Sequence, residues 1–217
     1  MGKIKNPIQV HWTNNVGGLV GYHAFGNHYW RANAQNILNP RTARQQEARA
    51  KFAFTSELIA AFVPAYKVGY KEYAQGRSPR AEFCHQLKLA GAITGNMSDG
   101  YTVDYEKVQL AKGVLLPTYS MTCSVLGAQH KVSYTWTDNS GQGDAEASDI
   151  LCSVLYNVTK KVCMFTETTS SRASEACQLI YPTAWAGDTI YNYVFWRKVN
   201  GTTYNADSQL VNFFVAE

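Results

Sequence analysis

The chain has 217 residues, of which 46% are hydrophobic and 17% are charged, and this balance excludes wholesale disorder. The net charge of +4 divides unevenly, because residues 1–90 hold 12 Lys and Arg against 4 Asp and Glu, whereas residues 91–217 hold 8 against 12. A basic half beside an acidic half fits either contact with nucleic acid or head-to-tail packing between copies.

Residues 1–38 read as an arm rich in glycine and aromatic residues. The segment VGGLVGYHAF is typical of a strand that lies close to other backbone, and Gly26-Asn27 can turn the chain into a second strand, HYWRA. A two-stranded ribbon is poorly stable alone, so we expect it to pack on this protein's helices or on a neighbouring copy. The side chains expected at that contact are Trp12, Tyr22, Phe25, Tyr29 and Trp30.

Residues 39–114 are predicted to be helical, with an edge strand at their end. The first helix can be capped by Asn39 before Pro40, or by Thr42 with Gln45 in another register. Its apolar stripe at helical spacing comprises Ala48, Phe52, Thr55, Ile59, Phe62 and Val63.

Four cations mark the start of this helix, and we expect all four to mediate subunit contacts. Arg41 and Arg44 extend the apolar stripe toward the N-terminus, whereas Arg49 and Lys51 flank it. We therefore expect Arg41 and Arg44 to pair with carboxylates at a packing boundary, within the chain or on a neighbour.

Two further helical segments follow. After Pro64 comes a short helical or extended piece, AYKVGYKEYA, and Ser78-Pro79 can cap a helix that ends at Gly95 with Ile93 facing inward. The alternating segment YTVDYEKVQLAKG predicts an edge strand.

Residues 115–217 alternate with period two and predict an immunoglobulin-like, fibronectin type III-like sandwich of seven strands. We expect Trp136 on the inner face, and Tyr191 or Tyr193 as a tyrosine corner. The fold class is thus α+β to mainly β. The strands are predicted near residues 119–126, 131–137, 149–156, 161–167, 176–181, 189–198 and 203–215.

No motif for catalysis, phosphate binding or paired-cysteine chemistry is present, so we predict neither enzymatic activity nor a cofactor. His11, His23 and His28 lack further ligands at metal-binding spacing. The segment from Asp138 to Glu146 departs from the calcium-loop pattern and lacks its final bidentate acid. We predict no metal site, although weak calcium binding by this loop stays open.

No segment is apolar enough for a membrane span, and the N-terminal residues lack the apolar core of a signal peptide. Without an export signal, we expect the five cysteines to be reduced.

The segments VGGLVGYHAFGNHYWRAN, NPRTARQQEARAKFAF, AITG, VDYEKVQLAKG and YTWTDNSGQGDAEASD, in this order, resemble a family of Bacteroidota proteins known only as a domain of unknown function. The arm departs from that family's Trp-Lys-Gly segment at HAFGNHYW. The family implies no catalytic or ligand residues. The helix start more loosely resembles those of small phage virion proteins.

We therefore expect a non-enzymatic structural subunit of a large assembly, of a phage or phage-like kind, located in a virion or in the bacterial cytoplasm. One alternative is a sandwich that binds glycan or protein through its aromatic loops. Another is a nucleic-acid packaging protein that uses its basic half, with Lys/Arg on phosphates and aromatic rings on bases.

Overall fold

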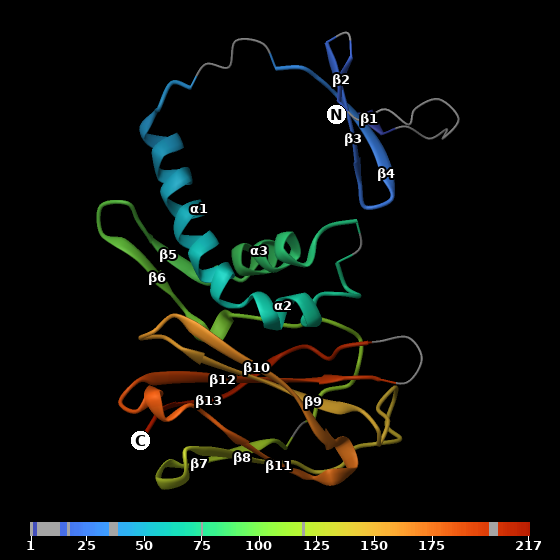
Figure 1. Ribbon diagram of the computed structural model, residues 1–217, viewed down its shortest axis with the longest axis vertical. Coiled ribbons are helices and arrows are strands. Elements are labelled where there is room, and N and C mark those ends of the chain that lie inside the picture. Colours follow the sequence, from blue (N-terminus) through green and yellow to red (C-terminus); the bar gives the residue numbers. More distant parts are fainter. Residues whose placement is uncertain are drawn as a thin grey trace. The chain divides into compact units, whose positions relative to one another are not determined.

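The computed structural model describes residues 2–3, 14–16, 18–34, 39–74, 76–118, 120–199 and 204–217. Within these ranges the fold is α+β, with three α-helices and several small antiparallel sheets (Figure 1), which confirms the expected class. The chain forms two compact units, Met1–Gln46 and Glu47–Glu217.

The first unit contains an antiparallel sheet with the strand order β1-β4-β3-β2. Its strands are β1 (Gly2–Lys3), β2 (Asn14–Val16), β3 (Leu19–Ala24) and β4 (Asn27–Ala32). The expected hairpin is therefore confirmed, but its turn lies one residue earlier than predicted. Phe25 and Gly26 form the turn with φ of 51° and 74°, and Asn27 already pairs with Ala24. The Asn27 side chain explains the shift, because it donates to the Phe25 carbonyl at 3.0 Å.

The helices are α1 (Ala43–Ala61), α2 (Val63–Gly69) and α3 (Pro79–Leu89). α1 uses the Thr42 register, since the Gln45 amide donates to Thr42 Oγ1 at 3.3 Å. The predicted Ser78 cap of α3 is confirmed by a bond of 3.1 Å from the Ala81 amide. The buried face of α1 starts only at Thr55, and the side chain of Phe52, expected inside, is 58% exposed.

Two predicted boundaries after α3 are wrong. The helix ends at Leu89 rather than at Gly95, and Ile93 begins the hairpin of β5 (Ile93–Asn96) and β6 (Gly100–Val103). The predicted edge strand stops at Val103, because the Asp104 side chain accepts from the Glu106 amide and caps the 3-10 helix η2 (Tyr105–Lys107).

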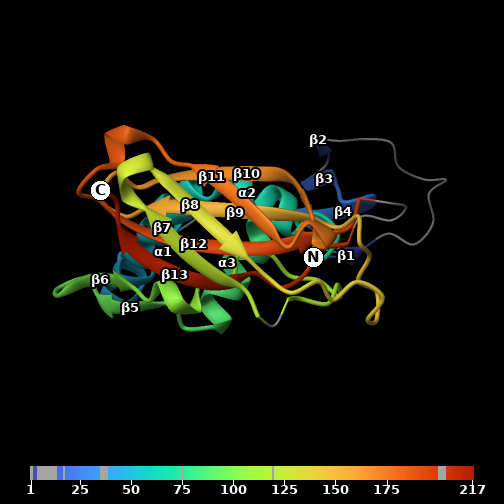
Figure 2. The same ribbon diagram turned by 90° about the horizontal axis from the view of Figure 1, so that it is seen from below.

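All seven strands predicted in the C-terminal part are present, and they form two antiparallel sheets with the orders β10-β9-β12-β13 and β11-β8-β7. They are β7 (Thr122–Leu126), β8 (Lys131–Thr135), β9 (Ile150–Asn157), β10 (Val162–Ser171), β11 (Ala176–Ile180), β12 (Thr189–Arg197) and β13 (Gln209–Val215). Figure 2 shows the three-stranded sheet in front of the four-stranded one.

The second unit stacks the helices, the four-stranded sheet and the three-stranded sheet in that order (Figure 1). Val154, Tyr156 and Phe195 face the helices and share a core with Phe62 and Phe83. The opposite face of the same sheet shares a second core with the three-stranded sheet, through Leu151, Leu155, Val194, Trp196, Val132 and Tyr134. The four-stranded sheet is therefore covered on both faces.

The predicted inward position of Trp136 is confirmed, because its side chain lies in the second core and is 6% exposed. The tyrosine-corner prediction is wrong for Tyr193. Its side chain faces the helices and donates to the carbonyl of Tyr105, 88 residues upstream, at 2.8 Å, rather than to a carbonyl a few residues away. For Tyr191 the role stays a prediction.

A buried arginine joins the segments that enter and leave the two sheets. Arg172 is 0% exposed, follows β10, and donates to Asp149 at 3.2 Å, to the Asn139 side chain at 2.6 Å and to the Leu116 carbonyl at 3.0 Å. Its guanidinium lies 4.5 Å from the centre of the Trp196 ring. Burial raises the pKa of Asp149 and lowers the pKa of Arg172, because both charges have left water.

Replacing Arg172 should destabilise the protein strongly. Arg172→Met leaves Asp149 buried without its partner, and we expect the free energy of unfolding to fall by about 3–5 kcal/mol in urea titrations. The double variant with Asp149→Asn should recover part of the loss. Lys107→Met, which removes an exposed ion pair with Asp104, is the control and should leave the free energy of unfolding almost unchanged. Equal effects of the two single variants would contradict this role for Arg172.

Candidate interaction site

The described residues contain no group of three or more His, Cys, Asp or Glu side chains that could hold a metal ion. Within the same ranges, no helix is both long and apolar enough to cross a membrane. Asp138, in the loop considered for calcium, instead accepts from the Ser140 amide at 2.8 Å and from its hydroxyl at 2.9 Å.

The five cysteines are unpaired thiols. Burial raises the pKa of Cys152, that of Cys163 to about 12, and that of Cys123 to about 11. These three thiols are therefore protonated at neutral pH and are poor nucleophiles.

The predicted contact residues of the arm lie on its sheet, except Trp12, which falls outside the described residues. Tyr22 and Tyr29 face each other across β3 and β4 with stacked rings 5.4 Å apart. Trp30 is half-buried. Phe25 stands at the hairpin turn, and its side chain is 56% exposed.

The four predicted cations, Arg41, Arg44, Arg49 and Lys51, are all exposed. Neither Arg41 nor Arg44 forms an ion pair with another described residue, so the expected pairing is not made within this part of the chain. The reason is that the packed face of α1 begins at Thr55, which leaves the first turns of the helix without a covering layer.

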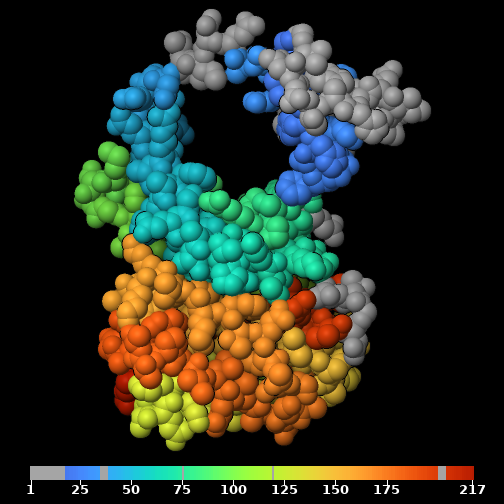
Figure 3. Space-filling model, viewed as in Figure 1, coloured from blue at the N-terminus to red at the C-terminus, as the bar shows by residue number. Residues whose placement is uncertain are grey.

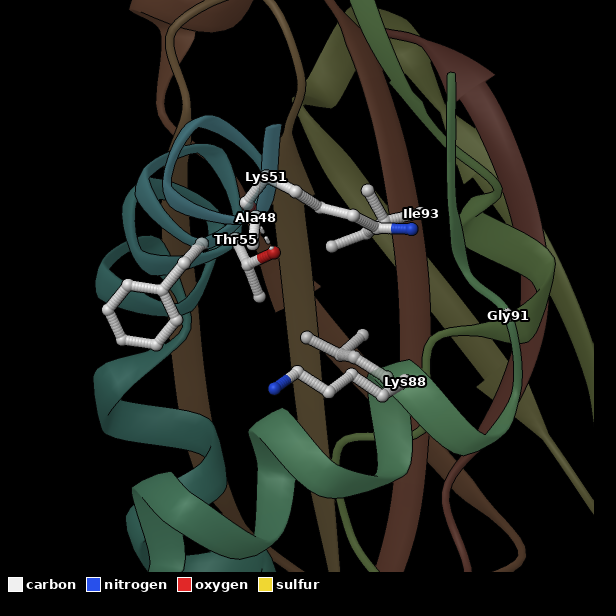
Figure 4. Close-up of a pocket in the computed structure, with 8 residues that line it drawn as sticks. Ala48, Lys51, Thr55, Lys88, Gly91 and Ile93 are labelled. Carbon is white, nitrogen blue, oxygen red and sulfur yellow. Dashed lines mark hydrogen bonds between the residues drawn. The ribbon is translucent and has the colours of Figure 1, made fainter. Parts of the chain in front are cut away.

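Lys51 lines a hollow of about 340 Å³ between α1, α3 and β5, which we call the cationic groove. In Figure 4, Lys51 reaches from α1 toward Ile93, and Lys88 extends from α3 toward α1. The lining side chains include two ammonium groups and no carboxylate. They are Ala48, Lys51, Phe52, Thr55, Leu87, Lys88 and Ile93, together with the backbone of Gly91.

A second hollow, of about 390 Å³, lies between α1, β6, η2 and β9, and we call it the aromatic groove. Four aromatic rings contribute to it, and Lys161 and Glu57 form an ion pair of 2.7 Å that is exposed at both ends. The lining residues are Phe54, Glu57, Leu58, Tyr101, Thr102, Val103, Tyr105, Tyr156, Val158 and Lys161.

The rings of the aromatic groove are held by contacts with their neighbours. Phe54 lies 5.5 Å from Tyr101, and Tyr105 lies 5.5 Å from Tyr156 and 4.5 Å from Tyr191. The strip continues to the exposed ring of Phe213, 5.6 Å from Tyr191. Tyrosine-rich surfaces of this kind are typical of protein interfaces.

Glu47 ties one wall of this groove to α1. Its carboxylate accepts from the Tyr101 hydroxyl at 2.6 Å and from the Met97 amide at 3.0 Å. Figure 3 shows the β5–β6 hairpin, in green, beside α1, in cyan. Loss of hydration, reinforced by the bond to Glu47, raises the pKa of Tyr101 to about 12, so its hydroxyl stays a donor at neutral pH.

The aromatic groove was not predicted from the sequence, because its lining residues come from three separate segments, 54–58, 101–105 and 156–161. The available signal was compositional: 14 tyrosines in a chain with few charges. Tyr101 and Tyr105 lay within the segment that was predicted as an edge strand, where no tertiary role could be assigned to them.

These features describe an α+β protein with exposed grooves. Residues 10–211 match the family model described as "Family of unknown function (DUF6266)", and the chain belongs to this family, which confirms the expected membership of a family of unknown function. Neither the search of curated proteins nor the search of solved structures found a match.

The carboxylate of Glu47 should determine how firmly the β5–β6 hairpin is held on α1. In Glu47→Ala the Met97 amide loses its acceptor, and its hydrogen-exchange protection should fall about tenfold, the equivalent of one such hydrogen bond. Glu47→Gln keeps a carbonyl acceptor and should lose less. Unchanged exchange at Met97 in Glu47→Ala would show that the hairpin is held by other contacts.

Proposed function

We propose that this protein is a non-enzymatic structural subunit of a large assembly, in which the N-terminal sheet is covered by a neighbouring subunit. The observation that carries the proposal is the exposure of the described hairpin. Across residues 18–34 Gly21 alone is buried, and the apolar side chains are half-buried or exposed.

Large apolar side chains that gather on an exposed surface are typical of interaction sites. The hairpin carries Leu19, Tyr22, Phe25, Tyr29 and Trp30 in exposed or half-buried positions. A subunit interface would cover such aromatic side chains.

The exposed cations at the start of α1 and just before it fit the same function. The half of the chain that starts at residue 91 holds 8 Lys and Arg against 12 Asp and Glu, so a neighbouring copy offers carboxylates to Arg41 and Arg44. The kind of assembly, a phage or phage-like particle, rests on the resemblance of the helix start to virion proteins. On the same basis, we propose that the protein is located in a virion or in the bacterial cytoplasm.

We also propose that residues 115–217 adopt an immunoglobulin-like fold of the fibronectin type III kind. Support comes from the division of seven strands into sheets of four and three, from their shared core, and from the buried Trp136.

The exposure of the cations on α1 favours a second candidate, nucleic-acid packaging. Phosphate contacts need Lys and Arg on a solvated surface, and all four predicted cations are solvated. The aromatic groove supports the third candidate, binding of glycan or protein.

The sheet proposal is tested by removing its stacked pair. Tyr22→Ser with Tyr29→Ser should convert the assembled protein into monomers, measured by gel filtration with light scattering across a range of concentrations. Ile180→Ser removes a side chain that is 66% exposed on β11 in the other unit and serves as the control. A wild-type protein that is monomeric at all concentrations, or a double variant that assembles normally, would contradict the proposal.

The double variant Arg41→Ala with Arg44→Ala distinguishes the two roles proposed for the cations, subunit assembly and nucleic-acid binding. Because both side chains are exposed, the free energy of unfolding should change by about 0.5 kcal/mol or less. If the protein is a structural subunit, the variant should assemble more weakly than wild type, and its affinity for a single-stranded oligonucleotide should be unchanged. Intact assembly together with loss of salt-dependent oligonucleotide binding, measured by fluorescence anisotropy, would favour packaging instead.

A further inference from the structure

We propose that Phe25, at the tip of the β3–β4 hairpin of one copy, inserts into the aromatic groove of a second copy. This inference rests on the proposed assembly and names the two surfaces that meet in it.

Phe25 is an unusual residue for the backbone conformation at the tip of the hairpin. Phe25 and Gly26 both have positive φ, 51° and 74°, as the central residues of a two-residue turn of the type I′ kind require. Asn-Gly is the favoured pair for this turn, and a bulky side chain at positive φ is disfavoured. The turn therefore carries a large apolar side chain, 56% exposed, at a position where a smaller polar residue would fit better. Such a residue is suited to anchor a contact.

The aromatic groove has the size and the lining that a phenyl ring needs. A cavity of roughly 150 Å³ lined by apolar side chains is large enough for benzene, and this groove measures about 390 Å³. Its wall includes Phe54 and Tyr101, with rings tilted by 36°, and aromatic rings gain from offset or tilted contacts with one another. The surplus volume leaves room for part of the hairpin turn.

Charge selects the aromatic groove over the cationic groove. Residues 1–38 contain three Lys and Arg and no Asp or Glu, so Lys51 and Lys88 repel the arm from the cationic groove. In the aromatic groove Glu57 balances Lys161. Residues that bond to its lining or lie beside it in sequence add the carboxylates of Glu47, Asp104 and Glu106. They also add the ammonium groups of Lys107 and Lys160. The surroundings of this groove thus carry one net negative charge, whereas the arm is basic.

The hairpin tip and the aromatic groove are different surfaces, and we infer that the contact runs in one direction, from the tip of each copy to the groove of the next. Repetition of such a heterologous contact produces a closed ring or an open filament, and a wild-type protein that forms only reciprocal two-fold dimers would contradict this arrangement. Each copy then offers one tip and one groove, and loss of either surface should have a matching effect.

The tip is tested by Phe25→Asn, which should keep the hairpin folded because Asn-Gly suits its turn. We expect at least a tenfold weaker association, measured by sedimentation velocity, and a thermal unfolding temperature no lower than wild type. Ile180→Asn is the control and should associate like wild type, since Ile180 is an exposed apolar residue, 66% exposed, on β11 in the other unit. Association of Phe25→Asn equal to that of wild type would overturn the inference while leaving the proposed function in place.

The groove is tested by Thr102→Arg, which places a long side chain from an exposed position of β6 into the hollow. This variant alone should also fail to form rings or filaments. A mixture of Phe25→Asn, which retains its groove, with Thr102→Arg, which retains its tip, should form heterodimers and nothing larger. A mixture that stays monomeric, or one that rebuilds the full assembly, would overturn the pairing of these two surfaces.

The contact can also be located directly. With p-benzoylphenylalanine in place of Phe25, irradiation of a mixture of isotope-labelled and unlabelled protein should give crosslinks between copies at Phe54, Tyr101 or Tyr105. Crosslinks near Lys51 and Lys88, crosslinks within one copy, or an assembled protein without crosslinks would each contradict the inference. A wild-type protein that does not assemble would end both the inference and the proposed function.

Discussion

Strands β9 and β12 must be covered on both faces, and most of the second unit follows from this requirement. Along β9, Leu151 and Leu155 enter the core shared with the three-stranded sheet, while Val154 and Tyr156 enter the core shared with the helices. An antiparallel sheet can leave one face to water, but strands that are apolar on both faces cannot. The helices are therefore needed as a layer of the unit, and the cores on the two sides of the sheet are set by alternate residues of the same strands.

The cluster around Arg172 links the chain segments that surround this double core. It joins the turn after β10 to the loop that contains Asn139, to Asp149 before β9 and to the backbone at Leu116. The Arg172 carbonyl also accepts from the Trp136 indole at 2.7 Å. Because an unpaired charge at this depth is costly, these segments are confined to arrangements that satisfy the arginine. The same bonds keep the loop considered for calcium in a defined conformation.

The surfaces available for function arise where the layers end. α1 is longer than the core that covers it, so Phe52 and the four cations before Thr55 stay exposed, and hollows form on both sides of the helix. One hollow is cationic, and the other is aromatic with surroundings that carry one net negative charge. The N-terminal hairpin has the complementary properties, a basic charge and an exposed aromatic tip. An assembly through these parts would leave the double core of the second unit untouched, so assembly and folding can be altered separately by mutation.

The sequence by itself determined the elements whose signals are local. The period-two pattern located all seven C-terminal strands, Ser78-Pro79 located the start of α3, and Gly26 located a hairpin turn to within one residue. Tertiary structure decided the rest. Helical spacing placed Phe52 on the apolar face, yet whether that face is covered depends on where the neighbouring layers end. The position of Tyr193 could not be predicted from its neighbours in sequence, because its hydroxyl donates to the carbonyl of Tyr105, which lies 88 residues away. The aromatic groove unites three segments that only packing brings together, and none of them forms the groove alone.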